Sequence, residues 1–264
     1  TIRTHTTSTI EDLLIDSVIL SDVDNVGIGF TTSDAESLIK RVRLSNIESH
    51  SGGSSVISAS PSIIDLSIDG IDIYDNTNVA IYLNDVGGRM SVRNVNVDGT
   101  TGANSYGLRV TEHVQGGAVF ENIEVRGCSA HGIYIASSPE CALRNITSVE
   151  NDLAGVIVES CQRAQMSGIQ AYNNSLDPAN TWAGVQVSGT AANISGHNIN
   201  SYDTQGGGAT QRYGLNIGAS VSDSEFIGTK THGNTIQGVL DGGTGNTIFD
   251  VTGAANISGK LIAS

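Results

Sequence analysis

The chain of 264 residues contains little proline and cysteine and no long apolar run, and these shortages limit the structures and sites that it can form. It contains three prolines, which is compatible with strands that stack without interruption. Its three cysteines form no CxxC motif and no histidine spacing matches a zinc site, so we expect no metal. No apolar run reaches the length of a membrane span, so we expect no membrane insertion.

Basic residues are also scarce. The chain has 13 lysines and arginines against 27 aspartates and glutamates, a formal net charge of −14. Only three of the basic residues are lysines, and such an acidic, lysine-poor composition resembles that of proteins from salt-loving organisms, where salt screens self-repulsion. A secreted acidic β protein is the alternative interpretation. In either case we expect no nucleic-acid partner, because phosphates would meet like charge.

Helical patterns and cofactor motifs are absent as well. No stretch sustains apolar residues at a 3.6-residue spacing, so we expect little or no helix. The glycines at 206–208 are not followed by the Lys-Ser/Thr of a phosphate loop, and we expect no cofactor.

We expect Cys128, Cys141 and Cys161 to be small buried thiols, although Cys141 and Cys161 fall in neighbouring repeats, where a disulfide can form.

A sequence repeat runs along the chain. Nine times a small residue precedes a short strand of alternating apolar residues, at a spacing near 26 residues. The segments YGLRV, HGIYI and AGVQV show the pattern. A fixed period with one structural unit per repeat indicates a solenoid. The small residues are Gly27, Ser55, Ala80, Gly107, Gly132, Gly155, Gly184, Gly214 and Gly238.

A ladder of turn residues lies roughly half a repeat further along. Asparagine and glycine adopt the left-handed backbone conformation at low cost, so these positions predict a sharp bend between two strands. Stacked asparagines can also form hydrogen bonds from coil to coil along the axis. The ladder consists of Asn46, Gly70, Asn94, Asn122, Asn145, Gly168 and Asn198.

The strand pattern and the asparagine turns together resemble the right-handed parallel β-helix, or pectate-lyase-like, superfamily over about residues 10–250. The resemblance implies an all-β fold, a right-handed parallel β-helix of about ten coils with three short strands per coil. At about 4.8 Å per coil, the rod would be on the order of 50 Å long. A β-propeller is disfavoured because it needs four strands in every 40 to 50 residues or so.

One domain accounts for the whole chain. We expect residues 1–264 to form a single β-helix domain, with a lead-in at 1–9, coils at 10–250 and a tail or junction at 251–264. Neither end has an amphipathic capping helix, and an uncapped solenoid exposes strand edges. We therefore expect other protein segments to cover the ends.

Ligands of the β-helix family usually lie on the outer face of the first strand of each coil. Alternation along that strand places Tyr82, Arg109 and Tyr134 on this face in three consecutive coils. Tyrosine rings around a guanidinium can stack on sugar rings and bind a carboxylate or sulfate. The alternative is an ordinary sheet surface with one Arg–Tyr stack. The whole outward row is Gly29, Ile57, Tyr82, Arg109, Tyr134, Ile157, Gln186 and Asn216.

Long loops precede the first strand in three coils, and one of them holds the only tryptophan, Trp182. Long loops on a rigid scaffold are common places for recognition, so Trp182 is a further ligand-binding candidate. A structural role at the base of the loop is the alternative.

Three acids near the same strand, Glu112, Asp152 and Glu159, are weak catalytic candidates, because glycoside hydrolysis needs a pair of carboxylates. His131 is a weak acid–base candidate, but we expect a solvated turn histidine instead. The Asn-Thr-Asp, Asp-Asp, Gly-His-Gly and Arg-Ile-Lys motifs of polygalacturonase-like members are missing, as are the calcium-binding aspartates of pectate lyases. These departures favour a protein that is not an enzyme and leave any catalytic residues unknown.

Three functions remain open. The leading hypothesis is an extracellular or virion-surface β-helix, in a high-salt environment, that recognises surface polysaccharides or glycoprotein glycans and resembles the shaft of viral tail spikes. Spike proteins of this type are commonly trimers, so the resemblance implies a homotrimer. The second hypothesis is a polysaccharide hydrolase or lyase that acts on an acidic glycan. The third is a structural spacer or capsid decoration.

Overall fold

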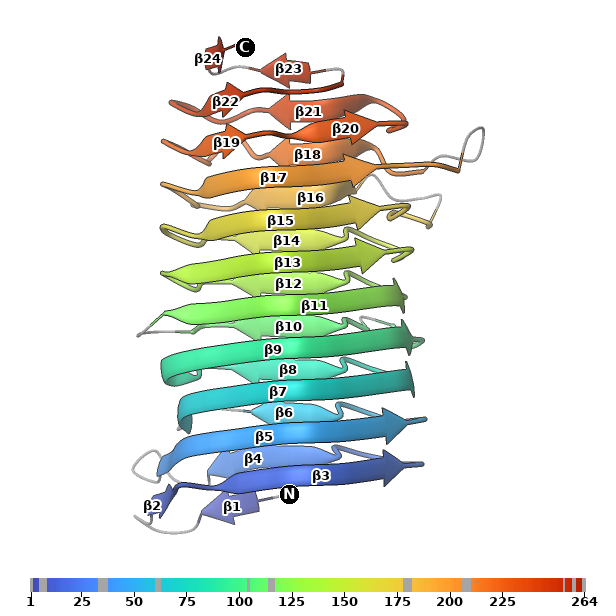
Figure 1. The fold of residues 1–264 in the computed structure, drawn as a ribbon, viewed down its shortest axis with the longest axis vertical. Helices are drawn as coiled ribbons and strands as arrows, with labels where there is room; N and C mark the ends of the chain where they lie inside the picture. Colours follow the sequence, from blue (N-terminus) through green and yellow to red (C-terminus); the bar gives the residue numbers. More distant parts are fainter. Residues whose placement is uncertain are drawn as a thin grey trace.

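The computed structural model describes residues 2–4, 9–32, 38–59, 63–103, 105–113, 117–177, 182–205, 210–253, 255–257 and 260–262. Within these residues the chain consists of strands, turns and loops and has no helix. The coils form one continuous stack with the two termini at its opposite ends (Figure 1). The expected all-β, right-handed parallel β-helix is confirmed, with about nine turns.

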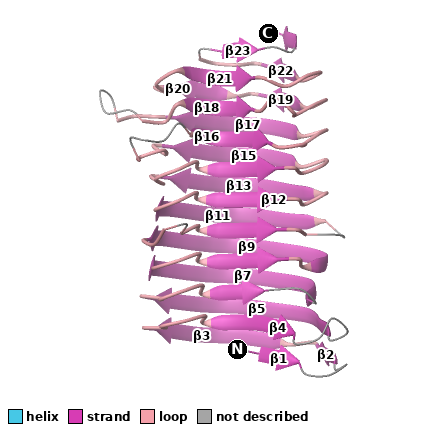
Figure 2. Ribbon diagram, turned by 180° about the vertical axis from the view of Figure 1, so that it is seen from behind, coloured by secondary structure: helices cyan, strands magenta, loops and turns pink. Residues whose placement is uncertain are grey.

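Each turn adds one strand to one sheet and one or two strands to the other, and all the pairs within the sheets are parallel. The short strands lie behind the long ones in Figure 1 and in front of them in Figure 2, so the sheets are opposing layers. We call them the short-strand sheet, with 11 strands, and the long-strand sheet, with 13.

Within each sheet the strands are stacked in chain order, except that β2 and β3 both pair with β5, and β19 and β20 both pair with β17. The short-strand sheet contains β1 (Ile2–Thr4), β4 (Ile28–Thr32), β6 (Ile57–Ala59), β8 (Ile81–Asn84), β10 (Leu108–Thr111), β12 (Ile133–Ala136), β14 (Val156–Glu159), β16 (Ala183–Ser188), β18 (Tyr213–Ile217), β21 (Gln237–Asp241) and β23 (Ala255–Ile257). The long-strand sheet contains β2 (Thr9–Glu11), β3 (Leu14–Ser21), β5 (Leu38–His50), β7 (Ile63–Asn76), β9 (Gly87–Thr100), β11 (Ala118–Cys128), β13 (Cys141–Val149), β15 (Gln165–Tyr172), β17 (Ser195–Tyr202), β19 (Glu225–Ile227), β20 (Lys230–His232), β22 (Thr247–Phe249) and β24 (Lys260–Ile262). The sheets therefore also include β1, which lies in the expected lead-in, and β23 and β24, which lie in the expected tail.

The expected second and third strands of most coils are one continuous strand that bends at the asparagine ladder. Asn94, Asn122 and Asn145 have φ angles of 50°, 55° and 52°, and glycine occupies the same place at Gly70 and Gly168. The Asn122 side-chain amide donates to Asn94 Oδ1 at 3.0 Å, and that of Asn145 donates to Asn122 Oδ1 at 3.2 Å. The ladder is confirmed, but backbone pairing continues on both sides of the bend, so these coils contain two strands rather than three.

The glycines before the short strands are required for space. A Cβ on Gly132 would lie 2.8 Å from the carbonyl oxygen of Gly155, and a Cβ on Gly155 would lie 2.7 Å from that of Gly184. Their φ angles lie outside the left-handed region. The close approach of the next coil therefore limits the size of these residues.

In one coil the expected register was wrong by one residue. Ile57 pairs with Ile81 and is fully buried, and Ser58 pairs with Tyr82 on the outer face. Val56 therefore occupies the small-residue position that was assigned to Ser55. The outward row contains Ser58 at this level, and Ile57 belongs to the core.

The core lies between the two sheets and is filled by alternate residues of the strands from β4 to β22. In β12, Ile133 and Ile135 are buried, whereas Tyr134 between them faces outward, as expected. The three cysteines are buried and free, which confirms the expectation of buried thiols. The largest fully buried side chains are Phe30, Phe120 and Phe226.

A second polar ladder runs inside the turns that lead from the long strands to the next short strands. Asn151 donates to Asn174 Oδ1 at 2.8 Å, and the Gln211 amide donates to Asn234 Oδ1 at 2.7 Å. Asn174 in turn donates to the carbonyl oxygen of Ser148 at 3.0 Å, and its backbone N–H donates to Gln211 Oε1 at 3.3 Å. These buried amides satisfy backbone groups that the turns would otherwise leave unpaired.

Candidate functional site

The short-strand sheet brings together the three residues expected to form a stripe. Tyr82 of β8 pairs with Arg109 of β10, and Arg109 pairs with Tyr134 of β12. Neighbouring parallel strands lie about 4.8 Å apart, so the three side chains emerge as one row along the axis. We call this row the tyrosine–arginine stripe.

Arg109 is the centre of the stripe. Its guanidinium carbon lies 5.4 Å from the ring centroid of Tyr82, 5.1 Å from that of Tyr106 and 5.9 Å from that of Tyr134. These distances are within the range of cation–π interactions. Arg109 Nε is buried without a hydrogen-bond partner, and Arg109 forms no ion pair with a described residue. No described carboxylate therefore neutralises this charge through an ion pair.

Tyr106 was missed by the sequence reasoning. It lies directly before Gly107, at the same repeat position that His131 occupies before Gly132. The sequence therefore contained a signal for Tyr106, because an aromatic residue directly precedes the small residue in two consecutive coils.

His131 is buried, so the expectation of a solvated turn histidine was wrong. Its Nδ1 accepts a hydrogen bond from the backbone N–H of Ala154 at 3.0 Å. The imidazole ring packs against Tyr106, with centroids 5.5 Å apart, and against Tyr134 at 6.3 Å. Burial lowers the pKa of His131 to about 4, so the ring is neutral at ordinary pH.

Trp182 joins the same group of rings. Its indole contacts His131 edge-on, with centroids 4.7 Å apart, and it is half-buried. The Trp182 carbonyl accepts the backbone N–H of Arg212 at 3.0 Å, which ties it to the next coil. We call Tyr106, His131, Tyr134 and Trp182 the aromatic cluster.

Of the three candidate acids, Glu159 contacts the stripe. The Tyr134 hydroxyl donates to Glu159 Oε2 at 2.5 Å, from β12 to the end of β14. Burial and this hydrogen bond raise the pKa of Tyr134 well above its ordinary range. Tyr134 therefore remains protonated and acts as a donor to the carboxylate.

The other two candidate acids lie elsewhere. Asp152 precedes β14, whereas Glu159 ends it, and Glu112 follows β10, two strands away from β14. Burial, with a contribution from Asp177, raises the pKa of Asp152. Glu112 and Glu159 thus lie at the same edge of the short-strand sheet, two strands apart, whereas Asp152 lies before the start of β14.

Beyond Tyr134 the outward row contains no further aromatic residue. Ile157 is almost fully buried, so it is not part of an exposed surface, although alternation placed it there. Gln186 and Asn216 pair in the next two strands and are half-buried. The aromatic part of the face therefore covers β8 to β12, with Trp182 at its border.

The described part of the chain contains no helix long and apolar enough to cross a membrane. No group of three or more His, Cys, Asp or Glu side chains that could hold a metal was found there.

The chain was compared with known proteins. No family model and no curated protein matches it. Among solved structures, full-length tailspike protein 2 from an Escherichia coli O157:H7 bacteriophage is 11% identical with a TM-score of 0.58, and the match covers 94% of this chain and 35% of that one. The enzymatically active domain of bacteriophage CBA120 tailspike protein 2 is 10% identical with a TM-score of 0.59, and the match covers 94% of this chain and 43% of that one.

This chain thus spans less than half the length of those tailspike structures. At 10 to 11% identity the likeness is one of fold. The chain therefore shares the parallel β-helix fold of phage tailspikes.

Proposed function

We propose that the short-strand face binds an acidic surface glycan, with Tyr82, Arg109 and Tyr134 as the central contacts. The observation that carries the proposal is Arg109, a cation between three tyrosine rings that no described carboxylate neutralises by an ion pair. A carboxylate or sulfate on the glycan would supply the missing counter-charge.

The surrounding rings suit a sugar. Tyr82 and Tyr134 are half-buried, so each presents part of its ring outward, and Trp182 adds apolar area at the border. Aromatic faces pack against the C–H faces of sugar rings, while the tyrosine hydroxyls form hydrogen bonds. Because His131 is neutral, Arg109 supplies the positive charge in this part of the site.

The location and the assembly are further parts of the proposal. The fold shared with tailspikes supports an extracellular or virion-surface protein that assembles as a homotrimer. Light scattering on the purified chain tests the assembly, because a trimer has three times the 27.3 kDa mass of the chain. A monomer over a wide concentration range would contradict this part.

A polysaccharide hydrolase or lyase is the second candidate function. The hydrogen bond between Tyr134 and Glu159 beside the stripe favours it, because it places a carboxylate where a glycan would lie. Incubation with acidic polysaccharides, followed by assays for reducing ends and unsaturated products, separates the two functions. Product that disappears in Glu159→Gln would make the chain an enzyme, and binding without product would leave it a recognition module.

A glycan array that includes uronic-acid, sulfated and neutral glycans tests the binding proposal. We expect binding to acidic glycans that falls about tenfold or more in Tyr82→Ser/Tyr134→Ser. Tyr74→Ser is the control, because Tyr74 lies on the long-strand sheet and stacks on His50. If wild type binds no glycan at low or high salt, the proposal is wrong and the spacer role remains.

A further inference from the structure

The long-strand sheet has a groove of about 780 Å³ on its outer face, near the starts of its strands. Its floor is a row of small or short residues in register from strand to strand: Ser67, Ser91, Val119 and Ala142. The lining extends from β5 to β15, which is five strand spacings or roughly 24 Å along the axis. Such a shape suits an extended, linear ligand.

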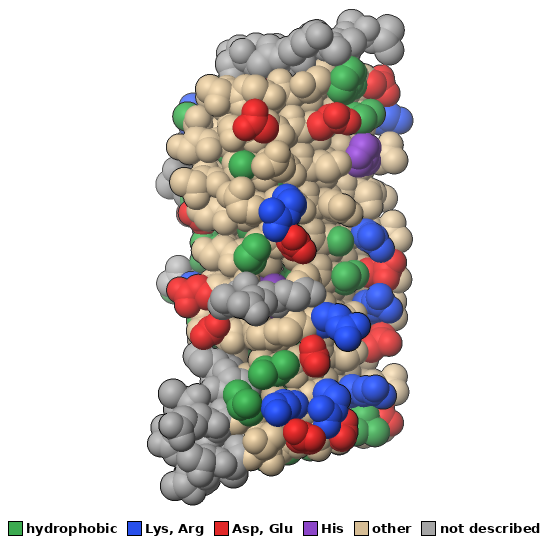
Figure 3. Space-filling model, turned by 90° about the vertical axis from the view of Figure 1, so that its left-hand side faces the viewer, with side chains coloured by type: hydrophobic (Ala, Val, Ile, Leu, Met, Phe, Trp, Pro, Cys, Tyr) green, Lys and Arg blue, Asp and Glu red, His purple; other side chains and the backbone are tan. Residues whose placement is uncertain are grey.

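The charge of this groove is opposite to that of the whole chain. Its lining contains five arginines and two acids, Asp65 and Glu140, although the chain carries a net charge of −14 and has 13 basic residues in all. On this side of the molecule the blue side chains gather mainly in the lower and middle part of the view, interleaved with red ones (Figure 3). The arginines are Arg41, Arg43, Arg89, Arg93 and Arg163.

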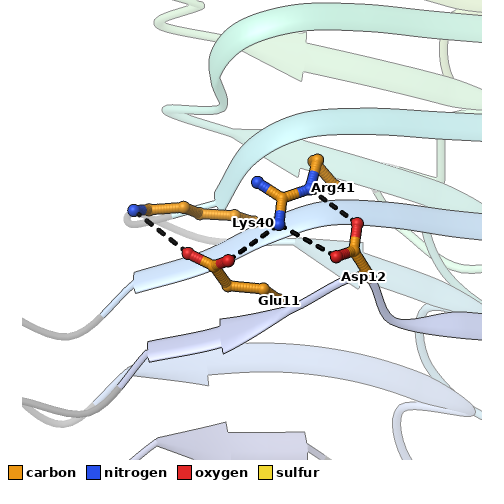
Figure 4. A network of polar contacts seen from close by, with 4 residues as sticks. All are labelled: Glu11, Asp12, Lys40 and Arg41. Carbon is orange, nitrogen blue, oxygen red and sulfur yellow. Dashed lines mark hydrogen bonds and ion pairs between the residues drawn. The ribbon is translucent and has the colours of Figure 1, made fainter.

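Three of these arginines are held by acids of the protein. Arg41 donates to Glu11 Oε2 at 2.8 Å and to Asp12 Oδ1 at 2.6 Å, in a network that includes Lys40 (Figure 4). Arg163 pairs with Glu140 at 2.5 Å. In addition, Arg93 Nε lies 3.3 Å from Glu121 Oε2. The pairs of Arg41 and Arg163 lie at the two ends of the groove, and that of Arg93 lies between them.

The other two arginines form no ion pair with a described residue, although the charge of Arg43 contributes to lowering the pKa of Asp12. Both Arg43 and Arg89 are exposed. Arg43 heads the floor row on β5, and Arg89 lies on β9, two strands further along. Their backbones are therefore roughly 10 Å apart along the axis.

We propose that this arginine groove is a second binding site, separate from the stripe, for a linear oligosaccharide that bears carboxylates or sulfates. The guanidinium groups of Arg43 and Arg89 bind acidic groups on two residues of the ligand. The hydroxyls of Ser67 and Ser91 form hydrogen bonds with sugar hydroxyls, as donors or as acceptors. The aliphatic side chains of Val119 and Ala142 contact the C–H face of a ring.

The lining argues against a nucleic acid in the same groove. Among the described residues that line it there is no aromatic side chain, so unpaired bases would find no ring on which to stack. A nucleic acid also carries one charge per phosphate and would meet the acidic remainder of the chain. A sparsely charged glycan meets less repulsion.

Calorimetric titration of the full chain at about 0.05 M NaCl, where surface charges are weakly screened, tests the groove. The probes are oligogalacturonate, a heparin-derived oligosaccharide, methyl-esterified oligogalacturonate, inorganic polyphosphate and a single-stranded oligonucleotide. We expect a carboxylated or sulfated oligosaccharide to bind and the methyl ester not to bind. Arg43→Ser and Arg89→Ser should each weaken this binding about tenfold, and the double variant about a hundredfold.

Two controls separate the groove from the stripe. Arg126→Ser removes the same charge from an exposed arginine outside the groove, and Tyr134→Ser disrupts the stripe; we expect both to retain groove binding. Groove binding should also leave the fluorescence of Trp182 unchanged, so the two sites can fail independently.

Several results would overturn the proposal. One is that neither acidic oligosaccharide binds, and another is that the double variant binds as well as Arg126→Ser. Tighter binding of polyphosphate or the oligonucleotide would assign the groove to another class of ligand. A change of oligomeric state in Arg43→Ser/Arg89→Ser would make it an interface between copies of the chain.

Discussion

At the scale of single residues, the ladder asparagines combine a backbone role with a side-chain role. Asn145 adopts a φ of 52° and also donates to Asn122. Alanine meets neither need, because its Cβ disfavours the left-handed region and it has no amide. We expect Asn145→Ala to lower the free energy of unfolding by about 2 kcal/mol in denaturant titration.

Asn145→Gly separates the two roles. Glycine accepts the positive φ freely, as Gly168 does in the next coil, so only the hydrogen bond is lost. The loss should be about 1 kcal/mol, since the side chain is exposed. Equal destabilisation by alanine and glycine would contradict the backbone role.

Burial of His131 predicts a dependence of stability on pH. Its pKa is about 4 in the folded chain, below the ordinary value of 6.5 for histidine, so the unfolded chain takes up the proton first as the pH falls. The contribution of neutral His131 is complete above about pH 6.5 and is lost progressively down to about pH 4. The loss at low pH should be at most about 3 kcal/mol.

His131→Asn is the comparison, because its side-chain oxygen can accept the Ala154 N–H without titrating in this range. The difference in free energy of unfolding between the two proteins, measured at a series of pH values, isolates His131 from the other groups. A difference that stays constant from pH 8 to about pH 4 would show that His131 is not buried as a neutral ring.

At the scale of elements, the turns from long to short strands depend on the inner ladder. Asn174 is fully buried and connects Asn151, Ser148 and Gln211. Its replacement by alanine leaves several buried groups unpaired, and we expect a loss of about 2 to 4 kcal/mol. Asn200→Ala is the matched control, because Asn200 lies in β17 with a partly exposed side chain. Similar thermal midpoints for the two variants would refute the role of the ladder.

The repeat made these elements predictable because every coil packs on its neighbours in the same way. The small residue, the alternating strand and the asparagine recur at fixed places, and Asn94, Asn122 and Asn145 adopt the expected backbone. Ser55 was assigned wrongly because it is a small residue one place before Val56. The continuity of the long strands was not predictable, since it depends on hydrogen bonds between coils that a local pattern does not contain.

At the scale of the whole molecule, a net charge of −14 predicts that salt stabilises the chain. Screening weakens self-repulsion as the Debye length falls from about 30 Å at 0.01 M to 8 Å at 0.15 M. We expect the thermal midpoint to rise by roughly 5 °C between about 0.01 and 0.3 M NaCl. Sucrose at equal osmolality is the control, and a midpoint that does not change with NaCl would contradict the high-salt hypothesis.

The surfaces were predictable only where they follow the strand period. Alternation and the repeat placed Tyr82, Arg109 and Tyr134 in one row. The contact of Trp182 with His131 joins residues about 50 positions apart in the sequence and was not part of the predicted row. The arginine groove was also missed, because Arg41 and Arg163 lie at bends with φ of 52° and 56°, which redirect their side chains.

The most direct test of glycan recognition uses Trp182, which is the only tryptophan of the chain and lies in the aromatic cluster. The measurement is the fluorescence of Trp182 during titration with the acidic oligosaccharide that binds best on the array. We predict a saturable change in emission for wild type that is lost in Arg109→Gln, with no change for the neutral counterpart of that sugar. An oligosaccharide that still binds Arg43→Ser/Arg89→Ser while the emission of Trp182 stays constant, or a response that Arg109→Gln retains, would contradict recognition at this face.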